Sequence, residues 1–553
     1  MLIGENNAGK SNVIDAIRLI TTPADGRRTR YCEMADVSTD TDESSFTLRA
    51  VYEGLSPAEQ ALMLTASMGI GTEAISHQLR FDLPVAGDRR GRTSWTVGAN
   101  ESLDPEPAAR DRIRHVYLPP LRDAEASLNS GSGDRIEFVM RTLAKGNEVE
   151  ELEASAASAF DSLGNHVLVQ RMDKAVSREL GTVTAGSIPH GSKLSFADPV
   201  LRQLARALRM KLSEHGVDPA DLASSGLGYA NLLFLATVVV ELSATRDADL
   251  TVFLVEEPEA HLHPQLQVAV LDFLRGALDR DEMPGAVQVI ITTHSPQLAS
   301  AVPSEHLQIL KRAQLTSGDT AARQTRAVPI WALALDPQDR RKVDRYLDAT
   351  RSAMLFGPRV MLVEGIAEAL LVPSIARRIL DDDEFARFRG STLVAIDGVD
   401  FAPYVKVLLS CHDGACVADQ VVVVTDEDPE SPGDRTAALE SLAKSLGSEE
   451  RLQIATAPNT LEAALFEAGN GSPIKTAFLA QRPKSGHVWD EYVESVDGAA
   501  RPAGVVDMIR DKRVLKGDLA QSIAAFVDDI DQSFTTPDYL EAAIRAIVKV
   551  REA

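Results

Sequence analysis

The chain has 553 residues and a formal net charge of −24, because 57 lysines and arginines face 81 aspartates and glutamates. At roughly 100–200 residues per domain this length allows about three or four domains, and a composition of 44% hydrophobic and 25% charged residues excludes a disordered or fibrous chain. The acidity argues against a protein that coats nucleic acid with its whole surface, yet it is compatible with a local basic groove and with carboxylates that hold divalent metals.

Three further features concern location. The longest apolar run, Ala230–Val240, falls short of the roughly 20 residues of a membrane span. The N-terminal residues have no basic stretch leading into an apolar one, so we expect no signal peptide. Cys32, Cys411 and Cys416 cannot build a disulfide framework, and no CxxC pair indicates structural zinc. These features predict a cytoplasmic protein that works in a reducing compartment and not in a membrane.

Helical and strand periods alternate along most of the chain, which favours an α/β fold. The first region opens with a short strand, a glycine loop and a helix over Val13–Ile20, and strands follow at Ser45–Leu55 and His77–Leu83. Residues 135–180 have the pattern of long amphipathic helices. Because α/β features resume near Leu201, we interpret these helices as an insertion within the first domain.

The next region contains an apolar helix at Tyr229–Leu242 and two buried strands, TVFLVEE and VQVIITTHS. A connecting helical segment over Ala332–Phe356 leads to a new α/β unit, which starts at Pro358 and continues to the end of the sequence. No internal repeat or low-complexity tract interrupts this order.

The first motif that carries chemistry is GENNAGKS, which lies between the apolar residues Leu2 and Ile3 and a helix. It fits the pattern G-x-x-x-x-G-K-[ST] in the strand–loop–helix context that the pattern requires. Glycines let backbone amides surround phosphate oxygens, and the helix N-terminus adds a positive dipole end. We expect Lys10 to contact the β- and γ-phosphates and Ser11 to bind Mg²⁺. The residues expected to bind ATP are Gly4, Asn6, Asn7, Gly9, Lys10 and Ser11.

Two strand ends add to this nucleotide site. TVFLVEE ends in two acids, a Walker-B arrangement in which Glu256 holds the Mg²⁺ shell and Glu257 polarises the attacking water. VQVIITTHS delivers His294 to its carboxyl end, where open α/β sheets place ligands and a histidine can sense the γ-phosphate. Surface acids and a core histidine are the plainer interpretation of each feature alone, and their combination with the P-loop favours the functional one.

The segment SSGLGYANLLF places small and polar residues before an apolar helix, which is the form of an ABC-type signature. In that role Ser225, Gly226 and Gly228 contact the γ-phosphate bound by a second protomer, so that ATP sites require a dimer. An ordinary helix cap is the alternative.

Three strands of the C-terminal region end in acidic residues. Glu364 ends one strand and is followed by Glu368 on the first turn of a helix, and Asp397 ends a second strand. Asp426 and Asp428 follow a run of four valines and share a face of the extended chain. If these strands are parallel neighbours, the acids meet at one sheet edge.

Carboxylates packed in this way repel one another unless they hold hard cations, and oxygen ligands favour Mg²⁺ or Mn²⁺ over zinc. Two such ions can clamp the attacking water and the leaving 3′-oxygen of a phosphodiester. A helix cap or a solvated loop acid is the alternative for any single residue of the set. For Asp397, the roles of metal ligand and of structural strand cap are equally supported.

The order of P-loop, helical insertion, SGLG helix, EEPEAHLHP and TTHS resembles the ABC/SMC-type ATPase half of OLD-family (overcoming lysogenization defect) nucleases, a family that includes the large subunit of Gabija anti-phage systems. The run PPLRDA before the insertion agrees with this resemblance. The pattern E-G…D-G…D-x-D resembles a TOPRIM domain, which is found in topoisomerases, primases and OLD nucleases. The resemblance therefore covers nearly the whole chain.

The resemblance implies an α/β fold in which an ABC/SMC-type P-loop ATPase domain (1–124 and 196–340) contains a helical dimerisation insert (125–195). A linker (341–357) and a C-terminal TOPRIM domain (358–553) follow. It also implies that Glu462, in TLEAALF, completes the second metal site, and that Lys516, in VLKGDLAQ, neutralises charge on the pentavalent phosphate. A solvated surface lysine is the alternative for Lys516.

The chain departs from the family pattern at its N-terminus. In ABC-type domains, strands and an adenine-stacking aromatic residue precede the P-loop, whereas only Met1–Ile3 precede it here. Either the start lies further upstream or this version has lost one edge of its sheet.

These features together predict a DNA endonuclease that uses Mg²⁺ or Mn²⁺, leaves 5′-phosphate and 3′-hydroxyl ends, and is regulated by ATP in anti-phage defence or DNA processing. We expect a homodimer or a higher homo-oligomer. A UvrD-like helicase is a possible partner, and the neighbouring genes would show whether one is present. The main alternative is a non-cutting, SMC-like ATP-dependent DNA clamp or repair module with a degenerate acidic domain. RNA cleavage or primer synthesis ranks lower, because no zinc ribbon or tyrosine-nucleophile domain is found.

Overall fold

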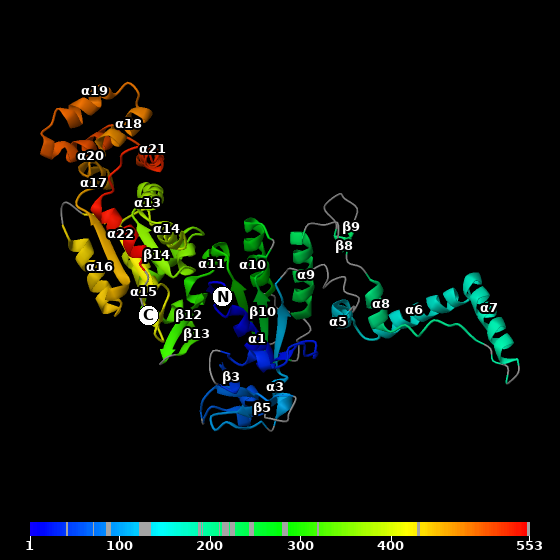
Figure 1. Cartoon of the computed structure of the whole chain (residues 1–553). Coiled ribbons are helices and arrows are strands. Elements are labelled where there is room, and N and C mark those ends of the chain that lie inside the picture. The colour runs from blue at the N-terminus through cyan, green and yellow to red at the C-terminus, as the bar shows by residue number, and fades with distance from the viewer. Residues whose placement is uncertain are drawn as a thin grey trace. The chain divides into compact units, whose positions relative to one another are not determined.

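The computed structural model describes residues 1–39, 43–69, 71–84, 90–104, 106–120, 134–185, 188, 190, 192–208, 211–212, 220–221, 227–242, 248–260, 262–278, 286–317, 320–427 and 432–549 (Figure 1). The chain forms two compact units. Unit 1 comprises Met1–Val13, Ser38–Asp42 and Thr292–Ala553, and unit 2 comprises Ile14–Val37 and Glu43–Ile291. Within the described ranges, no helix is long and apolar enough to cross a membrane.

Unit 2 contains two kinds of β-structure. Strands β2 (Thr22–Pro23), β7 (Ile113–Leu118) and β10 (Leu250–Glu256) run parallel, with Leu254 opposite Tyr117. A separate antiparallel sheet has the order β3-β4-β5-β6, and its first two strands confirm the strands predicted from the sequence. The bounds of this sheet are β3 (Ser45–Glu53), β4 (Ala74–Asp82), β5 (Arg92–Val97) and β6 (Ser102–Leu103).

Helices account for much of the rest of unit 2. The predicted helical region contains α5 (Asp134–Leu143), α6 (Glu148–Gly164) and α7 (Val167–Thr184), and three glutamates in the first turn of α6 complement its dipole. The predicted apolar helix is α9 (Leu227–Leu242), whose buried residues include Phe234 and Val238. Further elements are α2 (Pro57–Leu62), α3 (Pro107–Arg110), α8 (Leu201–Ala207), α10 (Pro264–Leu278), β8 (Lys211–Leu212) and β9 (Ala220–Asp221).

In unit 1, strand β1 (Leu2–Gly4) lies between two parallel neighbours. On one side it pairs with Thr292 and Thr293, the carboxyl end of β11 (Ala286–Thr293), and on the other with β12 (Gln308–Ser317). Strand β12 forms an antiparallel hairpin with β13 (Thr320–Pro329). The loop after β1 leads into α1 (Lys10–Ile20), so the predicted strand–loop–helix order is confirmed.

The C-terminal part of unit 1 is built on a four-stranded parallel sheet. Its order is β15 (Thr392–Ala395), β14 (Arg359–Val363), β18 (Gln420–Asp426) and β19 (Leu452–Ala457). Alternate residues of the central strands enter two cores: Met361 and Val422 pack on one face, and Leu362 and Val423 on the other. This two-sided burial explains the run of four valines in β18 and confirms the predicted fully buried strand.

Helices cover both faces of this sheet, and α22, drawn in red, lies along the strands (Figure 1). The second core also receives Ile3 of β1 and Leu355, which lies in the segment 341–357 that was predicted as a linker. The α-helices of unit 1 that follow β11 are α11 (Pro296–Ser300), α12 (Pro337–Tyr346), α13 (Ile366–Ile379), α14 (Asp382–Arg389), α15 (Ala402–Leu409), α16 (Asp434–Ser445), α17 (Leu461–Glu467), α18 (Gly471–Gln481), α19 (Gly486–Trp489), α20 (Arg501–Asp511), α21 (Lys516–Asp528) and α22 (Asp538–Val548).

The structure differs from the sequence-based expectation at two cysteines. A disulfide joins Cys411 and Cys416, whose Cα atoms lie 4.1 Å apart across the hairpin of β16 (Cys411–His412) and β17 (Ala415–Cys416). The turn residues Asp413 and Gly414 both have positive φ, as a tight two-residue hairpin requires. The expectation of reduced cysteines was therefore wrong for this pair, and the Asp-Gly turn signal was present in the sequence.

Candidate functional site

The loop after β1 has the geometry of a phosphate-binding loop. The Nζ atom of Lys10 donates hydrogen bonds to the carbonyl oxygens of Gly4 and Glu5, at 2.9 Å each, and lies 3.3 Å from Nδ1 of His294. Lys10 is buried, while Ser11, on the first turn of α1, is exposed. The structure thus brings together Lys10 and His294, two residues from opposite ends of the predicted ATPase sequence.

Two glycines of this loop are required by close contacts. Gly4 has φ +152°, and a Cβ atom there would lie 2.5 Å from the carbonyl oxygen of Leu310 in β12. Gly9 has φ +89°, and its Cβ would lie 2.8 Å from the hydroxyl of Thr325 in β13. Asn7 also has a positive φ, while Asn6 is exposed in the same loop. Larger residues at either glycine would displace the loop from the hairpin that supports it.

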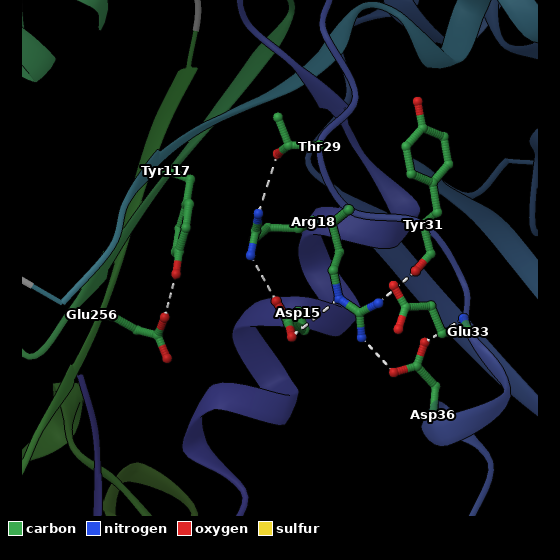
Figure 2. Close-up of polar contacts among 9 residues, drawn as sticks. Asp15, Arg18, Thr29, Tyr31, Glu33, Asp36, Tyr117 and Glu256 are labelled. Carbon is green, nitrogen blue, oxygen red and sulfur yellow. Dashed lines mark hydrogen bonds and ion pairs between the residues drawn. The ribbon is translucent and has the colours of Figure 1, made fainter. Parts of the chain in front are cut away.

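In unit 2, Glu256 ends β10 and is buried, as the Walker-B prediction requires (Figure 2). The hydroxyl of Tyr117 donates a 2.5 Å hydrogen bond to Oε2 of Glu256. Because Tyr117 lies opposite Leu254 in the parallel register, its side chain shares a sheet face with Glu256. The guanidinium of Arg18 lies 3.9 Å from the centre of the tyrosine ring and bonds Asp15, which fixes the ring in place.

Glu257 follows β10 with a φ of +44°, a conformation that non-glycine residues adopt rarely and that is found at functional sites. Gly228 lies in the first turn of α9. Ser225 and Gly226, the other two residues predicted for the signature, lie outside the described residues.

The second constellation lies at the carboxyl edge of the sheet β15-β14-β18-β19. Glu364 follows β14, and Glu368 lies on the first turn of α13, where its Oε2 accepts a hydrogen bond of 3.1 Å from the backbone N–H of Gly365. Asp426 ends β18, the strand beside β14. The parallel order of these strands therefore brings Glu364, Glu368 and Asp426 to one edge, as the sequence predicted.

Glu364 is fixed by three donors that act on a single oxygen. Its Oε1 accepts hydrogen bonds from the hydroxyl of Thr425, from the backbone N–H of Asp426 at 2.8 Å and from Nη1 of Arg435 at 2.9 Å. The same Arg435 nitrogen also reaches the Thr425 hydroxyl and the carbonyl oxygen of Asp426. Arg435, at the start of α16, thus connects the ends of β14 and β18.

The pKa of Asp426 is affected by the other carboxylates at this edge. Burial and, after it, the charges of Glu364, Glu368 and Glu462 together raise the pKa of Asp426 to about 8, while Lys516 opposes them. Burial also raises the pKa of Glu368, with Glu364 and Glu462 contributing. These side chains are therefore close enough to act on one another strongly.

Glu462 and Lys516 lie beside this edge. Glu462 is buried on the first turn of α17, which Thr460 caps, and its carboxylate oxygens lie 3.2 and 3.3 Å from Nζ of Lys516. Burial alone would lower the pKa of Lys516, but the charge and hydrogen bond of Glu462, together with the charges of Asp426 and Glu368, raise that pKa. The Lys516 side chain is 54% exposed, so its ion pair with Glu462, and not burial, is what favours a role at this site.

Two further residues, Asp397 and Asp428, were predicted as ligands. Asp397 lies after β15, but its carboxylate is 66% exposed and bonds Nη2 of Arg351 at 2.6 Å, which favours its role as a strand-end cap. Asp428 lies outside the described residues. Among the residues that are described, no three His, Cys, Asp or Glu side chains converge tightly enough to hold an ion without rearrangement. Glu364 and Glu462 are instead occupied by Arg435 and Lys516.

The raised pKa of Asp426 predicts how the metal-free protein responds to pH. Its folded-state pKa of about 8 lies above the usual value of about 4, so the folded chain retains a proton that the unfolded chain has released. The free energy of unfolding should therefore fall as pH rises from about 4 to about 8. Asp426→Asn cannot take up this proton and should flatten that part of the profile. Denaturant unfolding across this range in a chelator tests the difference, and parallel profiles for both proteins would contradict the assignment.

Sequence reasoning missed three polar residues of these sites. Tyr117, Arg435 and Tyr539 contact or face the predicted acids through elements whose positions depend on the fold. For Tyr117 alone a signal existed, because two adjacent parallel strands share side-chain faces once their register is known.

Comparison with known proteins assigns a domain family to each part. Residues 150–299 match the AAA ATPase domain, and residues 355–428 match the TOPRIM domain of overcoming lysogenization defect protein-like proteins. The Old nuclease of Escherichia phage P2 is 24% identical over 420 residues, which are 68% of this chain and 66% of that protein. The OLD nuclease of Thermus scotoductus is 24% identical over 331 residues, 58% of this chain and 54% of that protein.

The chain thus spans less than two thirds of the length of these relatives. Among solved structures, the C-terminal region of the Burkholderia pseudomallei OLD protein matches 35% of this chain and 97% of that chain, at 26% identity and a TM-score of 0.26. The chain therefore carries an AAA ATPase domain followed by an OLD-like TOPRIM domain, and it is a relative of the OLD nucleases.

Proposed function

We propose that this protein is a metal-dependent DNA endonuclease whose cleavage is regulated by its ATPase domain. The observation that carries the proposal is the common edge of parallel strands at which Glu364, Glu368 and Asp426 lie, with Glu462 and Lys516 beside it. Buried carboxylates of this density are costly without cations, and strongly perturbed pKa values of this kind are typical of functional sites.

The donor set suits Mg²⁺ or Mn²⁺, because these side chains offer carboxylate oxygens and neither sulfur nor imidazole. In this proposal Glu364, Glu368, Asp426, Asp428 and Glu462 hold the ions. When bound, such ions supply a nucleophilic water and stabilise charge on the phosphodiester oxygens. Lys516 adds a positive charge beside the negative charge that develops on the phosphate. Water attack at phosphorus leaves a 5′-phosphate and a 3′-hydroxyl.

The arginine and lysine contacts explain how the carboxylates remain together before an ion arrives. Arg435 holds one oxygen of Glu364, and Lys516 neutralises Glu462. An ion would compete with these two cations rather than enter a set of three preformed ligands.

For the ATPase domain, we propose that the P-loop binds ATP through Lys10 and that Ser11 and Glu256 hold its Mg²⁺, with Glu257 positioning water and His294 sensing the γ-phosphate. The signature residues would act across a homodimer or higher homo-oligomer. We further propose a cytoplasmic role on DNA in anti-phage defence or DNA processing, with or without a UvrD-like helicase partner.

A supercoiled plasmid tests the nuclease proposal. The full chain with Mg²⁺ or Mn²⁺ should convert the plasmid to nicked or linear forms, and chelation should stop this reaction. DNA-stimulated ATP hydrolysis without strand scission under any divalent cation would instead support the non-cutting clamp.

A further inference from the structure

Helix α22 places a tyrosine at the carboxylate edge of the sheet. The side-chain amide of Gln420, at the start of β18, donates a 2.7 Å hydrogen bond to the carbonyl oxygen of Ala546, near the end of α22. Because α22 also lies along the strands (Figure 1), it runs antiparallel to β18, and its first turn lies towards the strand end that carries Asp426. Tyr539 is on that first turn.

The hydroxyl of Tyr539 is buried, and within the part of the chain that the structure describes it has no hydrogen-bond partner. The ring packs against the core formed by Met361, Val422 and the covering helices. The charges of Asp426, Glu368, Glu462 and Glu364 all act on this hydroxyl, Asp426 most strongly. The phenol thus lies within electrostatic reach of the same four carboxylates that are proposed to hold the ions.

A buried hydroxyl without a partner destabilises the fold, and phenylalanine would fill the same space without that cost. Tyrosine is uncharged at neutral pH and can donate one hydrogen bond. The missing acceptor is therefore expected in the state in which the carboxylates hold ions and DNA, when oxygen atoms of a metal-bound water or of a phosphate enter the site.

We propose that Tyr539 is a hydrogen-bond donor of the nuclease site, and that its hydroxyl binds an oxygen atom that arrives with the divalent ion or with the DNA phosphate. This inference rests on the proposed nuclease function. It adds a contact from α22, a helix that supplies none of the acidic residues of the site.

Tyr539→Phe tests this role against a purely structural one. The matched control is Tyr492→Phe, which also removes one hydroxyl, in this case one that donates to Asp511 at 3.3 Å. Without metal, Tyr539→Phe should unfold at the same temperature as wild type or higher, because no hydrogen bond is lost. Its affinity for Mn²⁺ or for DNA should fall by about 10- to 100-fold, the range seen when a partner of a metal site is removed, whereas Tyr492→Phe should retain the wild-type affinities.

Two binding measurements identify the acceptor. Mn²⁺ titration without DNA, followed by electron paramagnetic resonance of the free ion, reports a metal-bound water. Affinity for a DNA duplex in Ca²⁺, without cleavage, reports a phosphate oxygen. A loss in either measurement supports the inference, and a lower unfolding temperature of the metal-free variant or unchanged affinity in both overturns it. The wild-type measurements separate the two ideas. If the wild type itself binds no Mn²⁺ and cuts no DNA, the proposed function fails, and the inference fails with it.

Discussion

Asp426→Asn is expected to abolish plasmid cleavage while leaving the fold and DNA binding intact. Asp426 ends the buried strand β18 at the same sheet edge as Glu364 and Glu368, and the charges of Glu364, Glu368 and Glu462 all raise its pKa, as expected for a residue of the proposed ion site. Two bound metal ions stabilise the charge that develops in the transition state. Losing them raises the transition-state free energy by several kcal/mol, which lowers the cleavage rate by about 10³-fold or more. Plasmid nicking in Mg²⁺ and Mn²⁺ measures the loss.

The control for this variant is Asp507→Asn, because Asp507 is a half-exposed carboxylate on α20 that pairs with Arg510. It should cleave DNA at the wild-type rate. DNA affinity in Ca²⁺ and the far-ultraviolet circular dichroism of Asp426→Asn should match the wild type, which separates a catalytic defect from misfolding. Cleavage by Asp426→Asn at more than about a tenth of the wild-type rate would remove this residue from the ion site.

Lys10→Ala is expected to lose nucleotide binding and ATP hydrolysis. The lysine is buried beneath the loop, and its Nζ atom is held by the carbonyl oxygens of Gly4 and Glu5 in the position from which it can reach phosphate oxygens. A hydrogen bond from a charged group contributes up to about 3 kcal/mol, so affinity for Mg²⁺-ATP should fall by about 10²-fold. Binding of a fluorescent ATP analogue measures this loss directly.

Lys475→Ala is the matched control, because Lys475 lies on α18 over the ring of Trp489, in the C-terminal part of unit 1 and away from the loop. It should bind ATP as the wild type does. Plasmid cleavage by Lys10→Ala with and without ATP then gives the sign of regulation: if nucleotide restrains cleavage, this variant cuts in the presence of ATP, and if nucleotide activates, it does not. Wild-type ATP affinity of Lys10→Ala would contradict the assignment of the loop.

Much of both sites follows from the sequence because parallel strands end at a common edge. A buried strand that ends in an acid, such as QVVVVTD, fixes both the layer and the edge at which Asp426 lies. The glycine loop is equally local, since its conformation depends on residues within one strand–loop–helix unit. The strands β14, β10 and β1 and the acids Glu364 and Glu368 were therefore predictable.

The residues that hold these acids were not predictable, because they come from elements whose approach is set by tertiary packing. Arg435 reaches Glu364 across 71 positions of sequence, and Arg351 captures Asp397 from 46 positions away. No spacing rule relates such pairs. The position of the Tyr539 side chain depends in the same way on the antiparallel direction of α22. The contact between Gln420 and Ala546 that goes with this direction forms only when the chain folds.

Ile3, the middle residue of β1, packs in the same hydrophobic core as Leu362 of β14 and Val423 of β18. The strand that leads into the phosphate-binding loop is therefore a neighbour, through this core, of the two strands that end in the acidic edge. Interiors are close-packed, so a displacement of β1 is transmitted to the packing beneath those strands. In the proposed function, this shared core would let nucleotide binding at the loop alter the spacing of the carboxylates without any contact between nucleotide and DNA.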